Sequence, residues 1–243
     1  MCTLSFVPKT DGFLLAMNRD EQRTRASGLP PAVHRCGDLA ALYPSESGGG
    51  TWVGINEAGI CASLINWYSR PQLRSAPAFS RGMIIPRLLS CSYLEEAEKS
   101  LLSFPLSRLK PFRLILMRSQ GDGVCEYRSY ESGVERVYHP WSSGHWFSSG
   151  YDEASASRVR GDVCRDAAKA SDAGTLSWLE RLHAAHNPKP GPDSVCMHRD
   201  DAATVSLTVL EVSGDSASMS YHDGPPCESI SRTPYQAMLP FLP

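Results

Sequence analysis

The sequence predicts a single α+β domain over residues 1–243, in which predicted strands outnumber predicted helices. Its 243 residues are 42% hydrophobic and 21% charged, which is ordinary globular usage. Single β-rich domains reach about 250 residues, so one domain accommodates this length. Apolar runs of strand length recur in pairs joined by turn residues, and helical spacing is limited to regions around residues 79–102 and 153–186.

The first hairpin is predicted at the start of the chain. Cys2 alternates with polar residues in the same phase as Leu4 and Phe6, so these three side chains share one strand face that points into the interior. The turn residues 8–12 precede a second apolar run, which ends in the charged segment 18–21. Antiparallel pairing brings that segment back beside Cys2.

A second hairpin is predicted from a glycine loop and an Asn-Glu-Ala-Gly turn within residues 48–59, followed by the strand 60–66. The strand ends at Asn66. Its side-chain amide either aims an N–H at an oxyanion or simply caps the strand end. No Gly-Lys-Ser/Thr follows the triple glycine, so a phosphate-binding loop is excluded there.

The remaining elements follow the same logic. Apolar residues at helical spacing predict helices over 79–89 and 92–102, the latter with Leu102 on its packed face. Two helices are also predicted between 153 and 186. The aromatic segment 141–151 suits either a rim over a pocket or a packed loop, and the packed loop is favoured. Alternation predicts the strands 112–118, 124–130, 134–138, 194–198, 203–212 and 217–221.

Charge and cysteine spacing exclude several classes of protein. Twenty-four basic against 26 acidic residues give a net charge of −2, which removes the case for binding nucleic acid or anionic membranes by bulk charge. The eight cysteines never occur at C-x-x-C spacing, so we expect no metal cluster. We expect no signal peptide and no transmembrane segment, hence a cytoplasmic protein with free thiols.

Two histidines and one cysteine have positions that suggest chemistry. His183 and His186 lie at i and i+3 of a predicted helix, where they either bind a metal or haem or end the helix favourably. Cys2 follows the initiator methionine. If Met1 is removed, Cys2 carries both a thiol and an α-amine that titrates near 7.7–8.0 and accepts the thiol proton. The alternative is an ordinary cysteine that happens to occupy position 2.

Four segments together resemble the NRDE (Asn-Arg-Asp-Glu) family, which includes the eukaryotic transport and Golgi organisation protein two. They are the opening Met-Cys-Thr, the tetrad 18–21, the Gly-Gly-Thr-Trp segment from residue 49 and the strand 203–206. The resemblance covers residues 1 to about 212. It implies an N-terminal-nucleophile (Ntn) hydrolase fold, a four-layer αββα sandwich of two antiparallel sheets between helices.

The N-terminal half also looks more distantly like penicillin V acylases and bile-salt hydrolases. That likeness implies that Cys2 attacks an amide, Asp20 orients its amine and Asn66 contributes to the oxyanion hole. Those hydrolases carry an arginine where this chain has Met17. Arg19 instead adjoins the aspartate on the opposite strand face, and either reaches the thiol or points outward. Arg199 is either the second arginine that these hydrolases carry near the thiol or part of a charged turn in water.

The function expected from these residues is acyl transfer from an amide or thioester of a hydrophobic acyl group, in a hydrolase of non-peptide C–N bonds without a cofactor. Asn18 and Glu21 of the tetrad, with Trp52 and Trp67, are the expected ligand-binding residues. The alternative is a non-catalytic carrier, because relatives in the resembling family are linked to trafficking, haem movement and acyl-CoA or lipid handling. The sequence identifies neither the ligand nor the oligomeric state.

Overall fold

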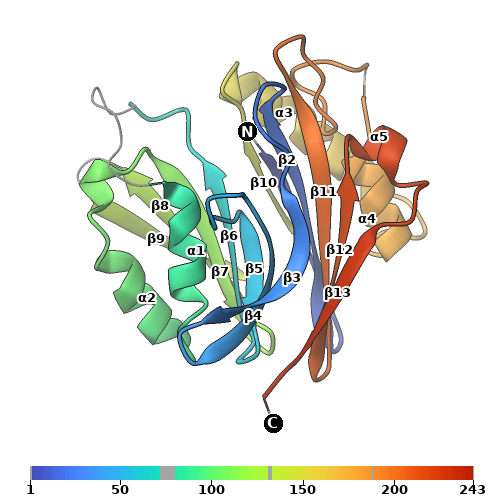
Figure 1. The fold of residues 1–243 in the computed structure, drawn as a ribbon. Coiled ribbons are helices and arrows are strands. Elements are labelled where there is room, and N and C mark those ends of the chain that lie inside the picture. Colours follow the sequence, from blue (N-terminus) through green and yellow to red (C-terminus); the bar gives the residue numbers. More distant parts are fainter. Residues whose placement is uncertain (1, 72–79, 131–132, 188, 243) are drawn as a thin grey trace.

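The computed structural model of the chain describes residues 2–71, 80–130, 133–187 and 189–242. Two antiparallel sheets pack face to face, and helices cover the outer face of each sheet (Figure 1). The predicted four-layer αββα sandwich is therefore confirmed. None of the helices in the described ranges is long and apolar enough to cross a membrane.

The first sheet has six strands and contains the N-terminal hairpin among its inner strands. Its order is β10-β1-β2-β11-β12-β13. The strands are β1 (Cys2–Lys9), β2 (Gly12–Gln22), β10 (Gly144–Ser148), β11 (Ala202–Ser213), β12 (Ser216–Asp223) and β13 (Tyr235–Pro240).

The second sheet has seven strands, which follow one another in chain order as a continuous meander. Each strand is therefore hydrogen-bonded to its neighbours in sequence. The strands are β3 (Leu29–Cys36), β4 (Leu39–Ser45), β5 (Val53–Asn56), β6 (Ile60–Asn66), β7 (Phe112–Arg118), β8 (Gly123–Tyr130) and β9 (Gly133–Pro140).

The helices divide between the two outer faces. The second sheet is covered by α1 (Ile84–Leu88) and α2 (Leu94–Leu102), with short 3-10 turns at Arg81–Met83 and Leu106–Arg108. The first sheet is covered by α3 (Glu153–Ala167) and α4 (Leu176–His183). The short α5 (Pro226–Ser229) lies beside α4 and β12.

The core between the two sheets confirms the predicted strand face at the N-terminus. Cys2, Leu4 and Phe6 are buried together there, as their alternation predicts. On the other face of the same hairpin, Leu14 and Ala16 pack against α3 and α4. The hairpin is thus buried on both faces, which is why its strands are almost wholly apolar or hydrogen-bonded.

Three sequence predictions differ from the structure. The segment 141–151 is not simply a packed loop, because β10 within it pairs with β1 and supplies the hydrogen-bonding partner that the edge of β1 requires. Residues 194–198 form a loop that makes a single bridge, His198 to Ala203. Leu102 is 55% exposed at the end of α2, and Phe79 lies outside the described residues.

Strands β3, β4 and β13 were not predicted at all. Strand β3 contains two adjacent prolines at the edge of its sheet, and only Pro31 and Cys36 of its eight residues are buried. Proline is tolerated at edges because no ladder hydrogen bond is lost there. The apolar pattern of β3 is therefore too weak to predict a strand, and the strand forms because it lies at the sheet edge.

Candidate active site

Register places the tetrad directly beside the N-terminal cysteine. Cys2 is paired with Arg19 across the β1–β2 ladder and with Ser148 on its other side. Strand β11 adjoins β2 on the far side, where Thr204 pairs with Asp20 just before a bulge. The end of β2 therefore lies next to the start of β1 in the sheet.

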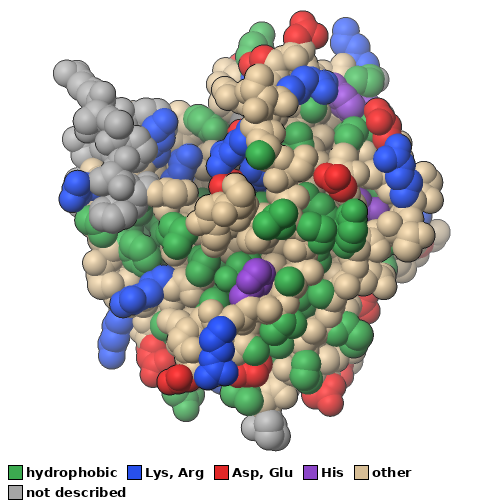
Figure 2. Space-filling view, viewed as in Figure 1, with side chains coloured by type: hydrophobic (Ala, Val, Ile, Leu, Met, Phe, Trp, Pro, Cys, Tyr) green, Lys and Arg blue, Asp and Glu red, His purple; other side chains and the backbone are tan. Residues whose placement is uncertain are grey.

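A cavity of about 110 Å³ opens at this position, and Cys2 lies in its wall. In Figure 2, basic and acidic side chains meet near the end of β1 that Figure 1 marks as the N-terminus. Most of the described lining residues are polar or charged. They are Cys2, Arg19, Asp20, Glu21, Arg25, Glu46, Thr51, Trp52, Leu64, Asn66, Ser80, Arg81 and Gly82.

The environment of the Cys2 thiol favours its protonated form. Only 8% of the residue is exposed, and burial raises the pKa of the thiol above its ordinary value. The negative charge of Asp20 acts in the same direction, whereas the Asp20 backbone N–H and the Arg19 guanidinium lower the pKa. Because burial dominates, the thiol needs a nearby base before it can act as a nucleophile.

Arg19 reaches the cavity and does not point outward. Its guanidinium donates to Glu46 at 2.9 Å and lies 3.6 Å from a carboxylate oxygen of Glu21. It also stacks over the indole of Trp52, with 4.8 Å between the guanidinium carbon and the ring centroid. Of the two directions that the sequence left open, the structure selects the inward one: Arg19 is a fixed positive charge in the wall that contains Cys2.

The Asp20 carboxylate forms a buried ion pair with an arginine that was not predicted as a site residue. Arg160 of α3 is fully buried, with its Nη1 3.4 Å from Asp20 Oδ2. The same nitrogen donates to Thr3 Oγ1 at 2.9 Å and to the Cys2 carbonyl at 3.4 Å. Thr204 Oγ1 donates to the other Asp20 oxygen at 2.6 Å. Arg160 thus links the carboxylate to the start of β1.

The sequence does contain a signal for Arg160. It stands four residues after Ala156 and four before Cys164, in the middle of the buried face of α3. A charged residue on the apolar face of a helix requires a buried partner. That reasoning identifies the residue, but not the partner it finds.

Asn66 and Arg81 complete the opposite side of the cavity. The Asn66 amide nitrogen donates to the Tyr68 hydroxyl at 2.9 Å, which leaves its second N–H for another acceptor. Arg81, also missed from the sequence, donates to the Pro111 carbonyl at 2.9 Å. Burial lowers the pKa of its guanidinium, while the hydroxyl of Tyr68 and the thiol of Cys2 raise it.

Three expected binding residues do not line this cavity. Asn18 faces the helix layer, where its amide donates to the His183 and Val195 carbonyls at 2.9 and 3.0 Å. Trp67 lies outside the lining, with the Arg70 guanidinium stacked on its ring. Arg199 lines an adjoining hollow instead, and the arginines that line the Cys2 cavity besides Arg19 are Arg25 and Arg81.

The two histidines predicted on one helix face are separated by the fold. His183 is fully buried, 2.9 Å from Ser5 Oγ and 3.0 Å from Asn18 Oδ1 through its two ring nitrogens. Helix α4 ends at His183, and His186 beyond it lies 3.1 Å from His198. The predicted pair therefore does not act on a common ligand.

Comparison with solved structures places the fold among the Ntn hydrolases. Penicillin V acylase from Agrobacterium tumefaciens superposes with a TM-score of 0.59 at 11% identity, over 99% of this chain and 86% of that one. A variant of conjugated bile acid hydrolase from Clostridium perfringens gives a TM-score of 0.53 at 12% identity, over 100% of this chain and 97% of that one. Likeness at these identities concerns the fold alone.

Sequence comparison points to a narrower group. The human Transport and Golgi organization protein 2 homolog is 34% identical over 124 residues, 47% of this chain. The aligned part spans 42% of the human protein, less than half its length. The family model described as Transport and Golgi organisation 2 matches residues 1–188, more than three quarters of the chain. With this match over most of its length, and with Cys2 and three of the four tetrad residues at one cavity, this chain belongs to the Transport and Golgi organisation 2 family.

Proposed function

We propose that the protein is an acyl-transfer hydrolase in which the Cys2 thiol attacks the carbonyl of an amide or thioester. When the substrate is an amide, the bond cleaved is a non-peptide C–N bond. One observation carries this proposal: Cys2, Arg19, Asp20 and Asn66 line the same cavity. A nucleophile, a fixed cation, a carboxylate and an amide donor are the groups that acyl transfer requires at one place.

The base in this proposal is the α-amine of Cys2, released when Met1 is removed. Met1 lies outside the described residues, so its removal remains a prediction. The amine is needed because burial raises the pKa of the thiol, and a free amine near pH 7.7–8.0 accepts the thiol proton. Asp20, held by Arg160 and Thr204, supplies the negative charge that orients the resulting ammonium group.

The reaction then has two stages. The sulfur forms a bond to the carbonyl carbon, and the carbonyl oxygen becomes an oxyanion that accepts the second N–H of Asn66. The ammonium returns its proton to the leaving amine or thiol as the carbonyl re-forms, which gives a thioester on Cys2. Water attacks that thioester, the α-amine takes one water proton, and the carboxylic acid leaves as the thiol is restored.

The walls of the cavity favour a small polar acyl group. We expected a hydrophobic acyl chain beside Trp52, Trp67 and Tyr68, but of these three only Trp52 lies in the lining. Six of the other twelve described lining residues are charged, and a volume of about 110 Å³ is small.

The carrier alternative gains no support from this cavity. Pockets that bury drug-sized ligands measure roughly 300–1,000 Å³, several times the volume at Cys2. Haem and acyl-CoA are larger than drug-sized fragments. The small volume therefore favours chemistry on the end of a substrate over enclosure of a whole cofactor.

An electrophilic acyl probe tests the proposal. Wild type, Cys2→Ala and Cys36→Ala are incubated with a small activated amide or thioester, and intact mass is recorded. Cys36 is the matched control because it is a buried thiol on β3, outside the cavity lining. We expect a mature chain without Met1, an acyl adduct on wild type and Cys36→Ala, and none on Cys2→Ala.

Two outcomes contradict the proposal. Retention of Met1 in the mature protein removes the α-amine, and with it the autonomous mechanism. An adduct that survives in Cys2→Ala, or its absence from wild type across a panel of polar acyl probes, shows that Cys2 is not the nucleophile. Saturable haem or acyl-CoA binding by an unreactive protein would instead favour the carrier.

A further inference from the structure

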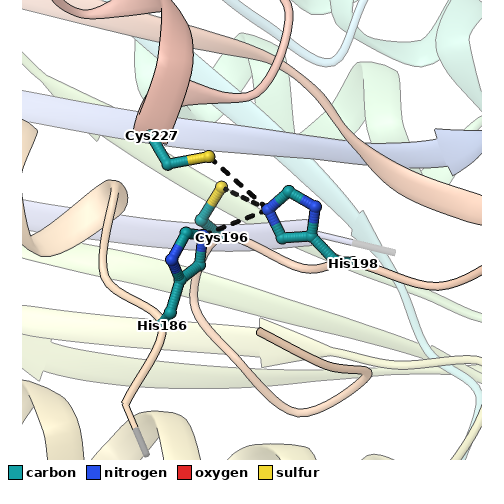
Figure 3. A group of neighbouring side chains, drawn as sticks. All are labelled: His186, Cys196, His198 and Cys227. Atoms are coloured by element: carbon teal, nitrogen blue, oxygen red, sulfur yellow. Dashed lines mark hydrogen bonds between the residues drawn. The ribbon is translucent and has the colours of Figure 1, made fainter. Parts of the chain in front are cut away.

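Two cysteines and two histidines from three separate segments converge on one point. They are His186 just after α4, Cys196 and His198 in the loop before β11, and Cys227 in α5. One ligand atom from each lies within 4.8 Å of all the others, and Figure 3 shows the four side chains turned toward one another. In the sequence they are separated by nine, one and 28 residues, a spacing that matches no short metal motif.

Three of the six distances among these atoms fit a tetrahedral zinc ion, and all six are within 4.8 Å. The Nε2 atoms of His186 and His198 are 3.1 Å apart, and His198 Nε2 is 3.5 Å from the sulfur of Cys196 and from that of Cys227. Zinc–sulfur bonds of about 2.3 Å and zinc–nitrogen bonds of about 2.0–2.1 Å place ligand atoms about 3.6 Å (S to N) and about 3.3 Å (N to N) apart. The observed separations agree with both values.

Hydrogen bonding does not account for the cluster. His198 Nε2 faces a second imidazole nitrogen and two thiol sulfurs at once. A neutral imidazole nitrogen offers either one proton or one lone pair, so it satisfies one of these three neighbours. A cation at the common centre satisfies all four ligand atoms simultaneously.

Burial and ligand type indicate the kind of site. Cys196 is buried and the other three residues are half-buried, so the ligand set is enclosed by protein. Two thiolates with two imidazoles form a Cys₂His₂ set, which is typical of structural zinc with no open position for substrate. We propose that His186, Cys196, His198 and Cys227 bind one Zn²⁺ ion in a closed structural site.

The proposed zinc ion fastens the loop that supports Asp20. Cys196 is followed by Met197, whose backbone N–H donates to Thr204 Oγ1 at 2.8 Å. That same hydroxyl donates to Asp20 at 2.6 Å. Zinc therefore ties α4 and α5 to the strand that positions the Asp20 carboxylate, while it touches none of the residues that line the Cys2 cavity.

Metal content is the direct test. Wild type, Cys227→Ser and Cys91→Ser are expressed in zinc-supplemented medium, purified without chelator and analysed by elemental mass spectrometry. Cys91 is the matched control because it is a half-buried free thiol like Cys227, but lies outside the cluster. We expect one zinc per chain in wild type and Cys91→Ser, and its loss in Cys227→Ser.

A cobalt experiment keeps the proposal testable if Cys227→Ser fails to fold. Wild type is stripped of metal and titrated with Co²⁺, and the expected result is the intense visible ligand-field absorption of tetrahedral cobalt with a thiolate charge-transfer band, saturating at one equivalent. A chelator is expected to lower the melting temperature of the zinc form.

Wild type without bound zinc and without the tetrahedral cobalt spectrum overturns the proposal. So does a Cys196–Cys227 disulfide found in the purified protein by intact mass under non-reducing conditions. Neither result depends on acyl transfer at Cys2, so the zinc site and the proposed function stand or fall separately.

Discussion

Replacement of Arg160 by methionine tests whether the buried ion pair behind Cys2 holds the site together. Arg160 and Asp20 are both fully buried, 3.4 Å apart. At an effective dielectric constant of about 20, unit charges at that distance attract by about 5 kcal/mol. Removal of one partner leaves the other charge buried, which costs about 3–5 kcal/mol in comparable pairs. We expect Arg160→Met to lower the free energy of unfolding by that amount.

The assay is urea unfolding followed by tryptophan fluorescence, with Arg165→Met as the matched control. Arg165 lies on the same helix and pairs with Asp162, but its side chain is 71% exposed. Its replacement is expected to change the free energy of unfolding by less than about 0.5 kcal/mol. A cycle completed with Asp20→Asn should show a coupling of about 2 kcal/mol, because the amide removes the orphaned charge.

Two results would refute this reasoning. If Arg160→Met destabilises no more than Arg165→Met, the carboxylate does not depend on that guanidinium. If Asp20→Asn and Arg160→Met have additive effects, the two groups do not interact despite their distance. Either outcome would remove the structural account of how Asp20 is positioned beside Cys2.

Three further predictions rest on particular contacts. Gly12→Ala should lower the free energy of unfolding by more than about 2 kcal/mol, because the added Cβ would lie 2.0 Å from a backbone oxygen. Gly49 also has a positive φ but lies in open space, so Gly49→Ala should lower it by about 1 kcal/mol. Equal losses of unfolding free energy in urea would contradict this. Burial lowers the pKa of His183 to about 3, so below the unfolded value of 6.5 the unfolded state takes up a proton that the folded state does not. The free energy of unfolding should therefore fall by about 2 kcal/mol between pH 6.5 and 5. An imidazole of His183 that titrates above pH 5 by NMR would exclude this. Arg19→Gln should slow iodoacetamide labelling of Cys2 by roughly 3- to 10-fold at neutral pH, because the guanidinium lowers the pKa of the thiol. Labelling at the wild-type rate, mapped by peptide mass, would show that the guanidinium does not lower that pKa.

Local pattern was sufficient for the hairpins and for the main helices. Alternation places Cys2 on an interior strand face, and a turn of fixed length brings the tetrad back beside it. Both features depend on neighbours in sequence, where strand period and turn residues act directly. The sheet edges were not predictable in the same way: β10 is a strand because β1 offers it an unpaired edge, and its own composition favours a loop.

The candidate site was also predictable only where it depends on neighbours in sequence. The sequence by itself determined that a cysteine, an arginine and a carboxylate meet at the end of one hairpin, because strand register is a local property. Only the tertiary structure decided that Asn18 faces the helices, that Arg160 and Arg81 lie at the site, and that two cysteines and two histidines from distant segments meet at one point. Those contacts join residues up to 177 positions apart, and no local pattern encodes a partner that the packing of sheets and helices brings into reach.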